Sequence, residues 1–264
     1  MEIKYLILFF FCGSALCCDI APAYWCDTEA IASQCGVLPA CSDRLYPSYA
    51  TEADPVVVGV YFECLCPDSI RFITNMLFPT WVKLRTTGVM KIMMVPYGKA
   101  TMNRHGSGYN FTCQHGPQEC EGNIIENCLL NETNYDEAKY LPVIQCMERS
   151  PQPVAAAEQC ITRSGLNWTN INACASSVNG TMLMHKAGLA TAALNPSLTW
   201  VPWITINGIH TDHIQSSAIT DLLTLVCETY KGEKPRSCQH TKHGIGAYAR
   251  RQRFSNKLYF RSRG

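Results

Sequence analysis

Apolar and polar positions follow one another in blocks along the chain, and the clearest apolar block begins at Pro55. Residues 55–62 (Pro-Val-Val-Val-Gly-Val-Tyr-Phe) are apolar and rich in β-branched side chains, which predicts a strand buried on both faces, as in a parallel sheet. A polar break covers residues 63–69. Apolar side chains then recur at helical spacing, at Ile70, Ile73, Leu77, Trp81 and Leu84. A second strand is predicted from Gly88 through Val95, so this stretch has the pattern of a βαβ unit.

The rest of the chain predicts further elements. Pro79 is expected to kink the helix of the βαβ unit. Residues from 100 to about 180 are polar and cysteine-rich, and we interpret them as an inserted, mostly helical region cross-linked by disulfides. Met182 to Leu194 predicts an amphipathic helix, Trp200 to Gly208 a strand entered through proline, and Ile214 to Tyr230 a closing helix.

The first residues have the pattern of a secretory signal peptide. Lys4 is followed by the apolar run Tyr5 to Phe11 and by small residues from Gly13 to Ala15. We expect cleavage near Cys17–Asp19, which makes residues 1–18 the leader. The apolar run is short for a bilayer span and no later segment has 18 uncharged apolar residues, so we expect no stable membrane insertion.

The cysteine content changes the picture of the mature chain. The sequence has 16 cysteines, and behind a signal peptide these indicate a disulfide framework in an oxidising compartment. The pairing does not follow from spacing. Four N-glycosylation sequons agree with this compartment and predict surface positions, at Asn110, Asn131, Asn167 and Asn179.

Charge is divided unevenly along the chain. The formal net charge is +1, but seven basic residues and no acidic residue lie between Lys242 and Gly264. The remaining chain carries a formal net charge of −6. We interpret residues 233–264 as a solvated, disordered tail, or as a substrate for proteases that cut at Arg250-Arg251. Binding of the tail to an anionic surface or nucleic acid is the alternative, and we expect no nucleic-acid partner.

Cys66 lies where the first predicted strand gives way to its helix. The thiolate is the reactive form of cysteine, and the partial positive charge and free N–H groups of a helix N-terminus favour it. Pro67 suits the first helical position, so Cys66 is predicted to cap the helix with its sulfur facing those N–H groups. The alternative is an inert buried cysteine or half of a structural disulfide.

A signature later in the chain points to a family. The stretch from Cys113 to Cys128 resembles the signature C-Q-H-G-x-x-E-C-x-x-N-x-x-x-x-C of the gamma-interferon-inducible lysosomal thiol reductases. Every fixed position is present, namely Cys113, Gln114, His115, Gly116, Glu119, Cys120, Asn123 and Cys128. The segments Phe78-Pro-Thr-Trp81, Val95-Pro-Tyr-Gly98 and Val201-Pro-Trp203 and the pair Cys227 and Cys238 also resemble the family.

The resemblance implies a domain plan. It covers residues 24 to about 240 and implies an α/β, thioredoxin-like fold over residues 54–232 with a helical, disulfide-rich insertion at about 100–180. Residues 19–50, with Trp25-Cys26, Cys35 and Cys41, resemble the small saposin A-type segment that precedes the fold.

The resemblance also implies an activity. It implies a secreted or lysosomal glycoprotein that acts as a thiol–disulfide oxidoreductase on disulfide-containing proteins, without a metal or prosthetic cofactor. In thioredoxin folds a cis-proline loop faces the reactive cysteine and offers its backbone to substrate, and Val201 and Pro202 match that loop.

The matching active-site tetrad departs from the Cys-x-x-Cys of the family. It reads Cys66-Pro67-Asp68-Ser69, and serine cannot close a disulfide. Cys66 could act as a monothiol, with glutathione or another small thiol resolving the mixed disulfide. Alternatively, Cys64 could resolve it, since strand geometry would place both cysteines on one face. The third outcome is a catalytically weakened or inactive protein that binds disulfide-rich or unfolded clients.

The signature residues allow more than one role. We expect Cys113, Cys120 and Cys128 to cross-link the insertion, and Glu119, Asn123 and Gln114 to satisfy backbone groups. His115 could be a general base, and the nearby cysteines with His115 could bind zinc. We favour the structural role, because the spacings do not match common zinc patterns.

Overall fold

The structure is a computed structural model that describes residues 34–37 and 53–239. The chain divides into two units, Met1–Ala50 and Thr51–Gly264. The first unit is described only at residues 34–37, where Cys35 is disulfide-bonded. The predicted signal peptide, most of the saposin A-type segment and residues 240–264 of the predicted tail therefore lie outside the described residues. The first part of the tail, predicted as disordered from residue 233, is described and differs from that expectation, since it forms a short helix at Arg236–Gln239.

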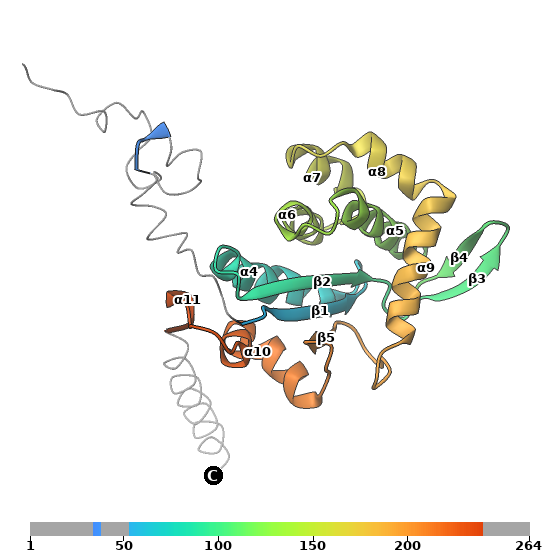
Figure 1. Cartoon of the computed structure of the whole chain (residues 1–264). Helices are drawn as coiled ribbons and strands as arrows, with labels where there is room; N and C mark the ends of the chain where they lie inside the picture. Colours follow the sequence, from blue (N-terminus) through green and yellow to red (C-terminus); the bar gives the residue numbers. More distant parts are fainter. Residues whose placement is uncertain (1–33, 38–52, 240–264) are drawn as a thin grey trace, which may run out of the picture. The chain divides into compact units, whose positions relative to one another are not determined.

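The second unit is built on a small mixed sheet (Figure 1). Within the described residues its strand order is β2-β1-β5, with β1 at Val56–Phe62, β2 at Met90–Pro96 and β5 at Trp203–Ile206. Strand β1 pairs in parallel with β2 and antiparallel with β5. The predicted buried strand is confirmed, since all but one residue of β1 are buried.

The helix after β1 follows Cys66 and begins with Pro67. It consists of α3 (Pro67–Phe72), a π-helical turn (Ile73–Leu77) and α4 (Phe78–Leu84). The chain remains helical through Pro79. Because proline has no N–H to donate, it interrupts the regular series of helical hydrogen bonds. The irregularity expected from Pro79 is a π-helical turn that directly precedes α4.

The inserted region begins with an element that the sequence analysis missed. An exposed antiparallel hairpin, β3 (Thr101–His105) and β4 (Gly108–Thr112), precedes the helices. The helices then follow in order as α5 (Pro117–Glu132), α6 (Glu137–Glu148), α7 (Ala157–Arg163), α8 (Trp168–Ala175) and α9 (Val178–Ala192). The prediction of a mostly helical region is therefore confirmed from Pro117 onward and wrong at the hairpin.

Disulfides fasten these helices to one another. Cys128 on α5 is bonded to Cys174 on α8, and Cys146 on α6 to Cys160 on α7. A short bridge, Cys113–Cys120, joins the end of the hairpin to the start of α5. The expectation that these cysteines cross-link the insertion is confirmed.

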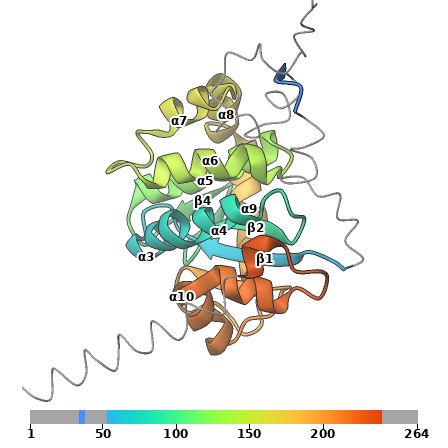
Figure 2. The same cartoon turned by 90° about the vertical axis from the view of Figure 1, so that its left-hand side faces the viewer.

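The chain closes with α10 (Asp212–Thr229) and the short α11 (Arg236–Gln239), which the Cys227–Cys238 disulfide joins. In both views α5 to α8 lie on one side of β1 and β2, and α10 lies on the other (Figures 1 and 2). A parallel βαβ unit, an insertion, an antiparallel strand entered through a cis-proline and a closing helix make up a thioredoxin-like fold. The predicted fold class is thus confirmed for the described part of the chain.

Candidate functional site

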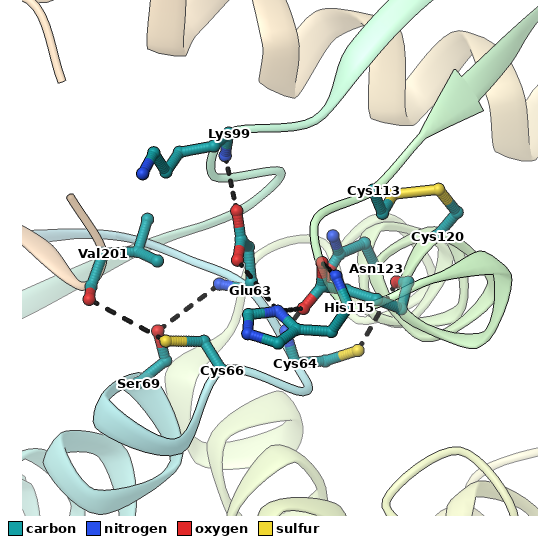
Figure 3. Close-up of polar contacts among 11 residues, drawn as sticks. Glu63, Cys64, Cys66, Ser69, Lys99, Cys113, His115, Cys120, Asn123 and Val201 are labelled. Atoms are coloured by element: carbon teal, nitrogen blue, oxygen red, sulfur yellow. Dashed lines mark hydrogen bonds and ion pairs between the residues drawn. A yellow bond between two sulfur atoms is a disulfide. The ribbon is translucent and has the colours of Figure 1, made fainter. Parts of the chain in front are cut away.

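Cys66 lies at the N-terminus of α3, as the sequence predicts. It is the N-cap residue, its carbonyl accepts the Ile70 N–H at 2.9 Å, and Pro67 follows as the first helical residue. Its thiol is free but the residue is only 7% exposed. The sulfur lies 3.9 Å from the Val201 carbonyl oxygen and makes no capping hydrogen bond (Figure 3). Cys66 is thus at the helix N-terminus, as expected, but its sulfur accepts no hydrogen bond from a helix N–H group.

The loop opposite Cys66 contains the anticipated cis bond. Val201–Pro202 is cis and leads directly into β5. Gln215 on α10 holds this loop from behind, donating from Nε2 to the Pro202 carbonyl at 2.8 Å and accepting the Ile204 N–H at 3.0 Å. Gln215 is buried and distant in sequence, and no local pattern marked it as a site residue.

Ser69 occupies the position of a resolving cysteine one turn into α3. It is completely buried, and its hydroxyl accepts the Glu63 N–H at 3.5 Å. Glu63 also accepts the Cys66 N–H through its carbonyl at 3.2 Å. The backbone of Glu63 is thus tied to both ends of the tetrad.

Cys64 is free but points away from Cys66 (Figure 3). Its N–H donates to Asn123 Oδ1 at 3.0 Å, and its thiol donates to the Glu119 carbonyl at 3.5 Å. A side chain at Gly122 would place its Cβ 2.3 Å from this sulfur, so the glycine leaves the space that Cys64 fills. The two cysteines do not share a strand face, because β1 ends at Phe62 and the chain turns at Cys64.

Acidic residues near Cys64 disfavour its thiolate. Glu126 on α5 and Glu148 on α6 are both buried. Burial and then these two carboxyl groups raise the pKa of the Cys64 thiol well above its usual value. Cys64 is therefore held in the unreactive thiol form.

A second group of polar side chains lies beside the tetrad. Glu63, which follows β1, and Glu119, in the first turn of α5, are buried and face the ring of His115 (Figure 3). His115 Nδ1 is 2.5 Å from Glu119 Oε2 and 3.3 Å from Glu63 Oε2. Burial raises the pKa of Glu63, against the opposing effect of the Lys99 N–H. Sequence analysis did not single out Glu63, although a charged residue directly after a buried strand is a signal.

The other signature residues are mainly structural. Cys113 and Cys120 are bonded to each other, which excludes the zinc site considered for them with His115. Glu119 Oε1 accepts the His115 N–H at 3.0 Å and Asn123 accepts from Cys64, so their predicted backbone role is confirmed. Gln114 is exposed instead. Gly116 caps α5 with φ of 92°, a conformation that favours glycine.

A pocket opens beside α3 and the cis-proline loop. Its volume is about 450 Å³, and its apolar walls include Met76, Trp200, Pro202 and Ile219. Trp200 and Ile219 are exposed, so two large apolar side chains of this pocket face solvent.

The surface features expected of a secreted chain are compatible with the structure. All four sequon asparagines are exposed, at Asn110, Asn131, Asn167 and Asn179. Among the described residues, none of the helices combines the length and apolar character needed to cross a bilayer.

Comparison with known proteins gives matches to one family. A family model described as gamma interferon inducible lysosomal thiol reductase (GILT) matches residues 57–164. The chain is 40% identical over 242 residues to the gamma-interferon-inducible lysosomal thiol reductase of Carassius auratus, covering 88% of this chain and 92% of that protein. It is 35% identical over 197 residues to the Mus musculus protein of the same name, covering 74% and 76%.

Other matches are more distant. GILT-like protein 1 of Drosophila melanogaster is 34% identical over 205 residues, which cover 72% of this chain and 82% of the relative. Among solved structures, Chlamydia trachomatis DsbA is similar at 14% identity with a TM-score of 0.46, covering 65% of this chain and 88% of that one.

Proposed function

The chain belongs to the gamma-interferon-inducible lysosomal thiol reductase family, and on that premise we propose that it is a monothiol oxidoreductase that uses Cys66 to exchange disulfides in protein substrates. Thiol–disulfide oxidoreductase activity is the activity of the family. The mechanism at this altered tetrad is the part that we propose.

One observation carries the proposal. Cys66 is a free thiol at the N-terminus of α3 and lies against the Val201 carbonyl of the cis-proline loop. A helix N-terminus stabilises the thiolate that forms when this proton leaves. In the proposed complex, backbone groups of this loop bond an extended substrate and bring its disulfide to the sulfur.

The first step consumes the substrate disulfide. The Cys66 thiolate attacks one sulfur of the disulfide, the substrate S–S bond breaks, and a mixed disulfide with Cys66 forms. The second substrate sulfur leaves as a thiolate and takes a proton from solvent. No electrons leave the system, because one disulfide replaces another.

The second step requires a thiol from outside the chain. Ser69 has no sulfur, and Cys64 points away from Cys66 and is kept protonated by burial and nearby acids. A small thiol of the glutathione class attacks the substrate sulfur or the Cys66 sulfur, which releases one partner of the mixed disulfide. Two such thiols per cycle reduce one substrate disulfide and become oxidised to the small-molecule disulfide.

The pocket beside α3 supports a protein substrate. Its apolar walls, with Trp200 and Ile219 exposed, suit side chains of a partly unfolded chain. The signal peptide pattern, the exposed sequons and the family's lysosomal members support a location in the secretory pathway or lysosome.

The test is turnover of a protein disulfide with and without glutathione. Cys66→Ala should reduce the rate to background, because it removes the attacking sulfur, while Cys64→Ala should retain glutathione-dependent turnover. Ser69→Cys should raise turnover with a dithiol reductant, since it restores an internal resolving thiol. Mass spectrometry after mild oxidation should find a glutathione adduct on Cys66.

Two outcomes would contradict this function. An unchanged rate in Cys66→Ala removes Cys66 as the nucleophile, and a Cys64–Cys66 disulfide in the oxidised protein replaces the monothiol mechanism by an internal one.

A binding protein without turnover is the second candidate, and the serine at the resolving position, Ser69, favours it. That function predicts a stable mixed disulfide between Cys66 and a client that glutathione does not release.

A further inference from the structure

Beyond disulfide exchange, we propose that Glu63, His115 and Glu119 form a binding site for one divalent transition-metal ion of the zinc class. The three residues come from different parts of the chain: the end of β1, the loop before α5 and the first turn of α5. They contribute one nitrogen and two carboxylate oxygens, a donor set that zinc accepts.

The donor atoms already converge. The three ligand atoms lie within 4.8 Å of one another. Ligand bonds of about 2.0–2.2 Å place neighbouring ligand atoms about 3.0–3.5 Å apart around a zinc ion. The 3.3 Å between His115 Nδ1 and Glu63 Oε2 meets this requirement. The 2.5 Å to Glu119 Oε2 must lengthen by about half an ångström, which a small rotation of the His115 ring provides.

Each carboxylate is held in the manner of a metal ligand. Glu63 Oε1 accepts the Lys99 N–H at 2.6 Å, and Glu119 Oε1 accepts the His115 N–H at 3.0 Å. In both residues the second oxygen, Oε2, is left directed at the imidazole. Backbone donors that fix the outer oxygen of a carboxylate orient the inner one toward a metal.

One of these oxygens lacks a hydrogen bond. Glu63 is 1% exposed at its side chain, and Oε2 has no hydrogen-bond partner among the described residues. The one N–H that Nδ1 can carry is directed at the nearer oxygen, Glu119 Oε2. A buried carboxylate oxygen without a partner is costly, and a cation between the three donors would give Glu63 Oε2 its missing partner.

The surrounding residues leave space for the Glu63 side chain and leave the proposed site open to ions from solvent. Gly98 has φ of +60°, and a Cβ at this position would lie 2.2 Å from Glu63 Cγ, so the glycine leaves the space for the Glu63 side chain. The His115 side chain is 33% exposed, so an ion can reach the site from solvent along the imidazole.

The experiment measures Zn²⁺ binding to the purified, oxidised full chain after chelation and removal of the chelator. The chain carries Cys64→Ala and Cys66→Ala, so that its free thiols do not bind the metal. Calorimetry and elemental analysis should give one Zn²⁺ per chain. Glu63→Gln and His115→Ala should each weaken binding at least about 10-fold.

The control variants change the same residue types, glutamate and histidine, at exposed positions away from the proposed site. Glu121→Gln, exposed on α5, and His213→Ala, exposed on α10, should leave the affinity unchanged. A second measurement uses the chain with its thiols intact. Zn²⁺ should raise its melting temperature, because a ligand of the native state stabilises it, and His115→Ala should abolish the rise.

Several results would overturn the site. Absence of stoichiometric binding would do so, as would equal affinity in the Glu63, His115 and control variants, which would mean adventitious binding only. Retention of the Zn²⁺-induced rise in melting temperature by His115→Ala would place the metal elsewhere. Because His115 is partly exposed, its alanine variant is expected to fold, and circular dichroism checks that it does.

Discussion

Glu126 and Glu148 are two carboxyl groups enclosed between α5 and α6, close to Cys64. Burial raises the pKa of Glu126 to about 8, and burial together with Glu126 raises the pKa of Glu148 well above its usual value. The folded chain therefore binds these protons more tightly than the unfolded chain, in which glutamate titrates near 4.3. Their contribution to stability is fully present below about pH 4.3 and is lost as the pH rises toward about 8.

Replacing Glu126 should weaken this pH dependence. We expect the free energy of unfolding of the wild-type chain to be lower at pH 7.5 than at pH 5. Glu126→Gln should shrink the difference by at least about 1 kcal/mol, the equivalent of roughly one pKa unit. Denaturant unfolding of the oxidised protein at both pH values measures it.

Glu121→Gln, exposed on the same helix, is the matched control and should keep the wild-type difference. A Glu126→Gln chain with the full wild-type pH dependence would show that this acid pair is not its source.

Residue-level prediction from sequence worked where chemistry is local. The junction of strand, Cys66, Pro67 and helix can be predicted from adjacent residues, and so can the serine in place of a resolving cysteine at Ser69. The structure has Cys66 at the predicted N-cap. The direction of its sulfur was not readable, because the Val201 carbonyl that it contacts lies 135 residues away. Glu63 was missed for the same reason, since its role depends on His115 and Glu119 from the insertion.

At the scale of elements, α10 fixes the cis-proline loop that lies against Cys66. Gln215 uses both ends of its amide on Pro202 and Ile204, and both contacts are buried. A helix that is far along the chain thereby sets the position of the Val201 carbonyl next to Cys66.

Gln215→Leu should therefore impair both stability and exchange. It leaves a buried carbonyl and a buried N–H without partners, at about 1–3 kcal/mol each, so unfolding should become easier by about 2 kcal/mol or more. The loop should also lose its position, which should lower kcat/KM for a protein disulfide under conditions where the variant is still folded. Denaturant unfolding and steady-state kinetics measure the two effects.

Gln159→Leu, an exposed glutamine on α7, should change neither quantity. A Gln215→Leu chain with wild-type kinetics would mean that the loop is held by other contacts.

Buried helices and strands were predicted from the sequence more reliably than exposed ones. The strand at 55–62 and the closing helix were predicted because their apolar patterns reflect burial in one core. The hairpin β3–β4 was missed because its residues are mostly exposed and its pattern carries no strong apolar alternation. Gly106 and Gly108 around the turn were the available signal. The start of α9 was placed late, since Ser177 caps it ahead of the apolar positions.

At the scale of the whole molecule, disulfides hold the helices of the insertion to one another. Cys128–Cys174 spans 46 residues, whereas Cys146–Cys160 spans 14. Since a crosslink restricts the unfolded chain more when its loop is longer, the two bridges should differ in their contribution to stability. None of these pairings follows from the spacing of the cysteines, because many pairings are compatible with one sequence.

Removing the disulfide with the longer loop, Cys128–Cys174, should lower the free energy of unfolding more. Cys128→Ala with Cys174→Ala should lower the free energy of unfolding by about 4 kcal/mol, and Cys146→Ala with Cys160→Ala by about 3 kcal/mol. Non-reducing denaturant unfolding of the two double variants tests the order. The reverse order would show that native-state packing around the helices, rather than loop length, decides the contribution.

The Cys113–Cys120 disulfide makes the structure of the protein depend on how reducing its surroundings are. It encloses the short segment that carries His115 and Glu119, and its two residues are 9% and 8% exposed. Under the monothiol mechanism proposed above, the small thiols that restart each cycle can also reduce this disulfide. The shielding of that one bond therefore limits how strongly reducing a compartment can become before the segment beside the tetrad is released.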